Sequence, residues 1–168
     1  MQKKHLKYLV LTALFAAIIY VATGVLPRID IGPGGYIHIG DAFIYLAACF
    51  LPLPYAMAAA AIGGSMADIL SPYIVYAPFT FVIKALLVIA FTNKSNKLMT
   101  LRSFVATIIA IPITVIGYYF AEAIIYGSFY TPLVNIVPSI GQAAASMLIY
   151  ILIAFALDKA KLKYKLMQ

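Results

Sequence analysis

The side chains most capable of binding or catalysis in this 168-residue sequence are a few ionisable groups in apolar surroundings. His38 and Asp41 lie in the segment GGYIHIGDAFIYL, directly before an apolar run. Asp68, Lys84 and Glu122 fall within long apolar segments. A charged side chain inside a membrane span costs about 2.5–3.5 kcal/mol on insertion scales, so it usually faces a partner or a wet cavity. We therefore treat these five residues as candidates for binding or pairing.

Several of these residues also have a purely structural interpretation. Asp41 precedes an apolar run and is expected to cap a helix there by accepting bonds from free backbone amides. Asp68 and Lys84 could form a structural pair between two neighbouring helices, or could contact a substrate directly. His38 could lie at the level of the lipid headgroups. Glu122 follows two tyrosines near the end of an apolar segment, where we expect it to line a ligand site.

Aromatic residues and glycines accompany these groups. The tyrosines that we place toward the same side of the membrane are Tyr36, Tyr73, Tyr76, Tyr126 and Tyr130. Tyrosine belts at the membrane interface are one explanation. Arg28 and Asp30 could belong to a solvated loop, and the sequence IGPGG that follows them is typical of a mobile lid or of backbone that closely approaches a ligand. Aromatic faces with a few hydrogen-bonding groups suit a small, flat, polar heterocycle.

Motifs for hydrolysis or ATP turnover are missing from the sequence. It contains no HExxH, no GxSxG and no glycine-rich phosphate loop with lysine. The two histidines are far apart in sequence, and Cys49 is the only cysteine, so we expect no metal site and no internal disulfide. We predict no cofactor and no enzymatic activity. Two other hypotheses compete with this one. The first is a small membrane enzyme with Glu122, Lys84 and Asp68 as its catalytic groups, and the second is a membrane scaffold that binds no ligand.

Composition places the chain in a membrane. Hydrophobic residues make up 65% of the sequence and charged residues only 10%, with a mean hydropathy of +1.02. A soluble domain usually carries about 25% charged residues, so this chain cannot cover a water-facing surface. The basic, apolar N-terminus resembles a signal peptide, but its apolar stretch is long enough to span a bilayer. We predict a retained first helix and one all-α membrane domain over residues 1–168.

The net charge of +7 would also suit a nucleic-acid-binding protein, but its distribution argues against one. Ten of the twelve basic residues fall in three short segments beside apolar runs: Lys3, Lys4 and Lys7; Lys94, Lys97 and Arg102; Lys159, Lys161, Lys163 and Lys165. Basic residues concentrate on the cytoplasmic side of membrane proteins. We therefore predict both termini in the cytoplasm and contact of the basic tail with anionic lipid. Asp158, among the last lysines, is expected to have no special role.

Apolar runs and proline breaks predict six transmembrane helices, an even number between each pair of basic segments. Proline removes a backbone donor and disfavours helix in the residue before it, so LPLP and SPY end helices. Pro112 is expected to kink the fifth helix. The second helix is too short to cross the bilayer alone. The predicted helices cover residues 6–26, 42–51, 55–70, 74–91, 101–126 and 132–157.

Three motifs in a fixed order give a family resemblance. They are ALFAAIIYVAT, YIHIGDAFIYLAA and GGSMADILSPYIVYAPFTFVIKALL, flanked by basic ends. With these, nearly the whole chain resembles the substrate-binding S components of energy-coupling factor (ECF) vitamin transporters. The nearest group is the riboflavin-type one, which is similar to carriers of pyridoxine, hydroxymethylpyrimidine and cobalamin. The lack of tryptophan departs from several thiamine and biotin S components and argues against those two ligands.

The resemblance implies a mechanism and a location. An S component in a prokaryotic plasma membrane captures a vitamin outside, docks on a transmembrane coupling subunit driven by two ATPase subunits, and topples to release the vitamin inward. The resemblance implies docking through Ala13 and Ala17, whose four-residue spacing also allows close helix packing in lipid. By position, it implies substrate contacts from Tyr36, His38, Tyr76, Lys84, Glu122, Tyr126, Asn135 and Gln142.

The resemblance leaves the vitamin open. Mixed acidic, basic and phenolic groups favour pyridoxine or hydroxymethylpyrimidine, with riboflavin and then cobalamin as alternatives. We expect the segment GGYIHIGD to combine a gate with a helix start. Asp41 and Asp68 are expected to have structural roles.

Overall fold

The computed structural model describes the whole chain except residues 1, 28, 31–35, 92–93 and 168. It is a helical bundle with one small antiparallel strand pair, in which Ile29 faces Ile37 and Asp30 faces Tyr36. The first half comprises α1 Gln2–Tyr20, η1 Val21–Val25, β1 Ile29–Asp30, β2 Tyr36–Ile37, α2 Gly40–Phe50 and α3 Leu53–Ile69. The second half comprises η2 Ile74–Tyr76, α4 Ala77–Leu87, α5 Leu101–Tyr126, η3 Thr131–Asn135, α6 Ile136–Lys159 and α7 Leu162–Met167.

All six predicted helices are present, and the all-α membrane fold is confirmed. Among the residues that the structure describes, three helical stretches are long and apolar enough to cross a membrane: Gln2–Val25, Leu101–Tyr126 and Thr131–Lys159. The differences lie at the ends. The first helix finishes in a five-residue π-helix, the fourth ends at Leu87, and α7 in the basic tail was not predicted. Helix ends depend on single turns, which hydropathy does not resolve.

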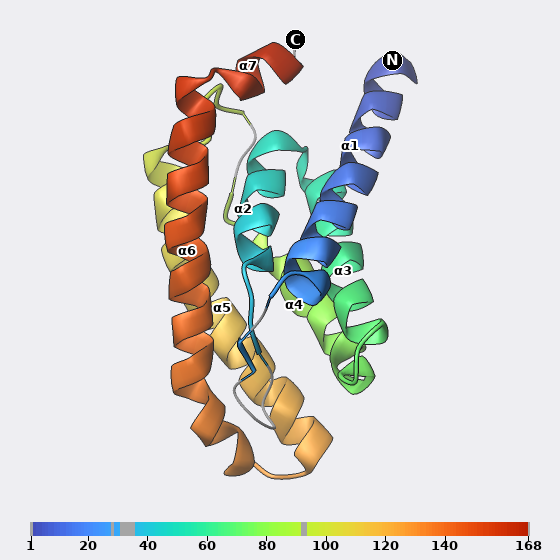
Figure 1. Cartoon of the computed structure of the whole chain (residues 1–168), viewed down its shortest axis with the longest axis vertical. Helices are drawn as coiled ribbons and strands as arrows, with labels where there is room; N and C mark the ends of the chain where they lie inside the picture. The colour runs from blue at the N-terminus through green and yellow to red at the C-terminus, as the bar shows by residue number, and fades with distance from the viewer. Residues whose placement is uncertain (1, 28, 31–35, 92–93, 168) are drawn as a thin grey trace.

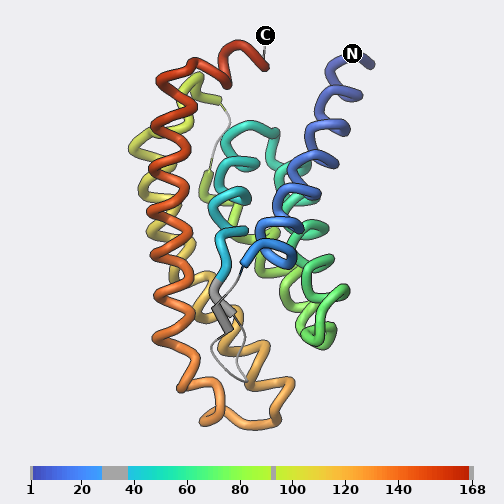
Figure 2. The backbone as a smooth tube through the Cα atoms, in the orientation of Figure 1, coloured from blue at the N-terminus to red at the C-terminus, as the bar shows by residue number. Residues whose placement is uncertain are grey.

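The short helix α2 forms the centre of the bundle. Ten of its eleven residues are buried, and it packs against α1, α3 and α6. Figure 2 shows it between α6 and α1. At a rise of about 1.5 Å per residue, eleven residues cover roughly 16 Å, about half of the hydrocarbon layer. As predicted, α2 does not cross the membrane alone, and its neighbours rather than lipid surround it.

Both described ends of the chain lie at the same end of the bundle (Figure 1). The connection between α4 and α5, which carries the second basic segment, reaches that end as well. The three basic segments therefore meet on one side, as the positive-inside pattern requires. We take this side as cytoplasmic, and the end with the strand pair as outer.

The distribution of polar and apolar side chains is the reverse of that in a soluble protein. Large apolar side chains cover the outside, among them Leu152, Ile124 and Phe155, each at least two-thirds exposed. The buried polar set includes His38, Asp41, Asp68, Lys84, Glu122, Asn135 and Gln142. A chain in lipid gains by turning apolar surface outward and pairing its polar groups inside.

Asp158 has a defined structural role, contrary to the expectation of none. Its Oδ1 accepts the backbone N–H of Leu98 at 2.7 Å, and its Oδ2 accepts that of Met99 at 2.8 Å. Nearby, Lys163 Nζ donates to the Ser95 carbonyl, and burial lowers the pKa of this ammonium group. These contacts attach the α4–α5 connection to the end of α6 and to α7.

We expect Asp158→Asn to destabilise the protein by about 2 kcal/mol, because the amide retains one acceptor oxygen where the carboxylate accepts two bonds. Thermal unfolding in detergent micelles would measure the loss. Lys161→Gln, an exposed neighbour, is the control and should leave the melting temperature unchanged. Equal melting temperatures for Asp158→Asn and the parent protein would contradict this role.

Candidate functional site

Two polar stripes face each other toward the outer end of the bundle. Residues four apart on a helix lie on the same face, and each stripe has three members at this spacing. They are Tyr76, Thr80 and Lys84 along η2 and α4, and Tyr118, Glu122 and Tyr126 on α5. The stripes run antiparallel. The Tyr76 and Tyr126 hydroxyls are 3.0 Å apart, and those of Thr80 and Tyr118 are 3.2 Å apart.

Lys84 forms a buried ion pair at the inner end of its stripe. Its Nζ lies 2.6 Å from Asp41 Oδ1, and the two side chains are 2% and 0% exposed. The same Nζ lies 5.2 Å from the centre of the Tyr118 ring, within the range of a cation–π contact. Lys84 thus pairs with Asp41 of α2, whereas the sequence had offered a pair with Asp68 or direct contact with a substrate.

The prediction that Asp41 caps α2 is wrong. The residue before α2 is Ile39, and no side chain caps this helix end. Asp41 lies in the first turn, where a carboxylate interacts favourably with the helix dipole, and its Oδ1 is committed to Lys84. Its Oδ2 accepts no hydrogen bond from the described residues. A cap requires the side chain to fold back onto its own helix, and the lysine draws it inward instead.

Glu122 occupies the middle of the α5 stripe and is 2% exposed. It accepts a hydrogen bond of 2.8 Å from the Asn135 amide, at the end of η3. A crevice too narrow in this structure to admit a water molecule adjoins this pair. Its lining residues are Val115, Tyr119, Glu122, Pro132, Asn135, Ile136 and Ser139. The structure therefore brings two predicted site residues together at a small space with an aromatic wall.

His38 and Gln142, 104 positions apart, form a third buried group. The His38 N–H donates to Gln142 Oε1 at 2.6 Å, and Gln142 Nε2 donates to the His38 carbonyl at 2.7 Å. His38 Nδ1 accepts the backbone N–H of Gly40 at 3.0 Å. His38 is buried, so its side chain faces other residues of the bundle rather than lipid headgroups.

The remaining predicted residues are scattered. Asp68 is buried near the end of α3, and its carbonyl accepts the Ser71 N–H and hydroxyl. Arg28 and the IGPGG loop lie outside the described residues, as does the side chain of Tyr36. Thr80 and Tyr118 were missed as members of the site. Their four-residue spacing from Lys84 and Glu122 was visible in the sequence.

The comparison with known families supports the transporter hypothesis. The family model for the S component of ECF-type riboflavin transporters matches residues 3–159. The chain belongs to this family. No curated protein matches the sequence. The protein is thus an S component of an ECF-type vitamin transporter, a multi-pass membrane subunit that works with an ECF module.

The docking face that the S component family implies lies on α1. Ala13 and Ala17 are both exposed on this helix, as a docking surface for the coupling subunit requires. Their role in docking is a proposal that rests on position and exposure. Thr12 and Ile19, on the other face, are buried.

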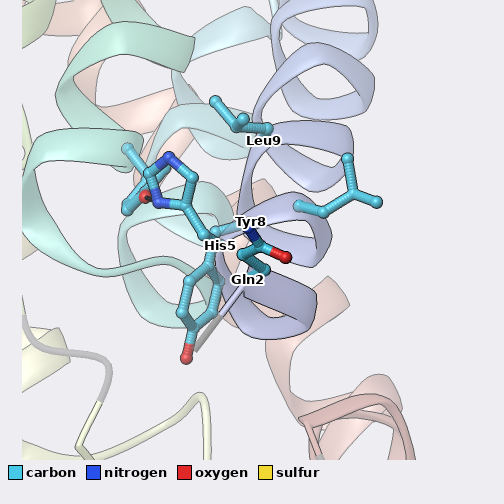
Figure 3. Close-up of a pocket in the computed structure, with 6 residues that line it drawn as sticks. Gln2, His5, Tyr8 and Leu9 are labelled. Carbon is cyan, nitrogen blue, oxygen red and sulfur yellow. Dashed lines mark hydrogen bonds between the residues drawn. The ribbon is translucent and has the colours of Figure 1, made fainter.

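A shallow crevice lies at the start of α1, at the cytoplasmic end of the S component. Figure 3 shows His5 and Tyr8 at this crevice, which Gln2, Leu6, Leu9 and Tyr55 also line. The Tyr55 hydroxyl is hydrogen-bonded to His5 Nδ1, and the Tyr8 and Tyr55 rings are 5.4 Å apart. None of the predicted substrate contacts lines it. It is therefore separate from the outer polar site.

Proposed function

We propose that this S component captures a small single-ring vitamin, pyridoxine or hydroxymethylpyrimidine, at the outer end of the bundle. Delivery inward would follow docking on the coupling subunit and two ATPase subunits, with toppling of the whole bundle. The observation that carries the proposal is the pairing of Glu122 with Asn135 beside a small crevice. Binding without chemical change is part of the proposal.

The dimensions of this crevice favour a small ligand. Pockets for drug-sized molecules have volumes of about 300–1,000 Å³, whereas the crevice at Glu122 is too narrow in this structure to admit a water molecule. A single ring would therefore require the least opening of the surrounding helices. The Glu122 carboxylate can accept a hydrogen bond from a ring hydroxyl, and the Asn135 amide can both donate and accept. The Tyr119 ring offers an aromatic wall for stacking. One hydroxylated heterocycle would use all three.

Riboflavin is the second candidate, and two observations favour it. The family description names riboflavin. In addition, the polar stripe from Tyr76 to Lys84 extends over eight residues, which corresponds to about 12 Å along a helix. A three-ring flavin with its polar side chain would contact more of this stripe than a single ring does.

Native mass spectrometry of the purified protein with a panel of B vitamins tests the proposal. We expect one pyridoxine or hydroxymethylpyrimidine per chain, with submicromolar affinity, about −8 kcal/mol or tighter. The bound vitamin should be recovered unchanged. Riboflavin bound in preference to both would overturn the single-ring assignment. No vitamin bound to protein shown to be folded would overturn the capture function for this panel.

Glu122→Gln tests the site itself. The substitution preserves shape but removes the charge, and hydrogen bonds to charged groups contribute about 1.5–3 kcal/mol. We expect vitamin affinity to fall about tenfold or more, measured by titration calorimetry. Tyr130→Phe is the control, because Tyr130 lies at the same end but is 84% exposed. Equal affinities for Glu122→Gln and the parent protein would place the ligand elsewhere.

A further inference from the structure

We propose that Gln142 is a positioning residue for the vitamin site rather than a ligand contact. It holds the backbone of His38 and, through it, the start of α2 that carries Asp41. This inference rests on the proposed capture function for its effect on binding, although its structural part does not depend on which vitamin is bound. The argument depends on how the hydrogen-bonding groups of Gln142 are used.

The Gln142 amide pairs with one residue of the backbone as a neighbouring strand would. It accepts the His38 N–H at 2.6 Å and donates to the His38 carbonyl at 2.7 Å, the two-bond pattern of a hydrogen-bonded pair in an antiparallel sheet. His38 directly follows β2. The Gln142 side chain, which belongs to α6, thus pairs with the backbone directly after β2 as a neighbouring strand would.

Few hydrogen-bonding groups of Gln142 are left for a ligand. A glutamine amide has two N–H donors. Nε2 donates to the His38 carbonyl and, at 3.2 Å, to the Ser146 hydroxyl. The amide orientation is also fixed, because exchanging its oxygen and nitrogen would set a donor against the His38 N–H. A vitamin could use the N–H donors of this amide only by breaking these bonds, which leaves it the second lone pair of Oε1 alone.

The residues after His38 connect the backbone held by Gln142 to the polar stripe on α4. His38 Nδ1 accepts the Gly40 N–H, and Asp41 pairs with Lys84 of α4. Four consecutive residues, 38–41, are therefore bonded to α6 at one end and to α4 at the other. Unpaired backbone groups are costly in a buried setting, and His38 and Gln142 are both buried. Loss of the amide would loosen the segment that places Asp41.

Hydrogen–deuterium exchange of the vitamin-free protein in nanodiscs tests the structural part. The variants are Gln142→Leu, which removes both bonds, and Gln142→Glu, which keeps an acceptor for the His38 N–H but loses both donors. We expect exchange in peptides covering residues 36–41 to rise about tenfold in Gln142→Leu and less in Gln142→Glu. Peptides from α5 should be unchanged. Gln2→Leu, at an exposed glutamine, is the control. Unchanged exchange at 36–41 would overturn the proposal.

Binding of pyridoxine and of riboflavin to the same variants separates positioning from contact. A positioning residue should weaken both probes by the same factor, about tenfold, because it acts through the placement of Asp41 and of its ion-pair partner Lys84 rather than through a contact with either ring. A selective loss of one probe, with exchange unchanged, would identify a direct contact and overturn the proposal. If the parent protein binds neither probe, the proposed function fails, while the exchange experiment still decides the anchoring by Gln142.

Discussion

Lys84→Met is expected to destabilise the protein by about 3–5 kcal/mol, because it leaves the Asp41 carboxylate buried without its counter-charge. Asp41 is 0% exposed, and its Oδ2 already accepts no bond from the described residues. Methionine matches the length of the lysine stem, so little packing is lost. The variant therefore isolates the charge. Thermal unfolding in nanodiscs would measure the effect, with Lys97→Met, at an exposed lysine, as the control.

The double variant Asp41→Asn/Lys84→Met sharpens this expectation. Removing both charges also removes the uncompensated one, and buried pairs replaced together are often close to neutral. We expect the double variant to be more stable than Lys84→Met alone, with a coupling energy of about 2 kcal/mol or more. Additive losses would mean that the two residues act independently and that the ion pair does not determine stability.

Much of the fold could be predicted because its signals are local. Long apolar runs mark the helices, and the prolines of LPLP and SPY mark breaks at the correct places. Three basic segments determine the sidedness without any knowledge of packing. The π-helix Val21–Val25 and the 3-10 turns escaped prediction, because they depend on how the ends of helices meet their neighbours.

The pairing of the site residues could not be predicted from local patterns. Asp41 and Asp68 were both available to Lys84, and the choice depends on α2 lying at the centre of the bundle. Gln142 was assigned to the ligand by position, although its amide is bound to backbone 104 residues away. By contrast, the stripe through Thr80 was present in the sequence as a four-residue repeat.

Asp158 illustrates a different failure. A single acid among lysines was expected to have no special role, but its carboxylate accepts two backbone N–H groups from a distant connection. The composition of a segment gives its number of charges, but it does not show which backbone N–H groups elsewhere in the chain need an acceptor. At Asp158, backbone N–H groups that would otherwise lack an acceptor determine the role of the acid.

Gly40→Ala is expected to destabilise the protein by about 3 kcal/mol, at the upper end of the usual cost of overpacking. An added Cβ at Gly40 would lie 1.9 Å from Thr23 Oγ1 and 3.0 Å from His38 Nδ1. Thr23 is buried within the π-helix at the end of α1. The glycine therefore allows the end of α1 to approach the start of α2, beside the His38 segment.

The controls for Gly40→Ala distinguish crowding from a loss of backbone freedom. Gly141→Ala adds the same methyl group where nothing lies within 4 Å, so it should be neutral or slightly stabilising in its helix. Adding Thr23→Ala to Gly40→Ala removes the clashing hydroxyl and should recover most of the lost stability, measured by thermal unfolding. If Gly40→Ala were as stable as Gly141→Ala, the approach of α1 to α2 would not be constrained at this point. A loss rescued at Thr23 would instead mean that the helix carrying Ala13 and Ala17 is packed directly against the segment that positions Asp41.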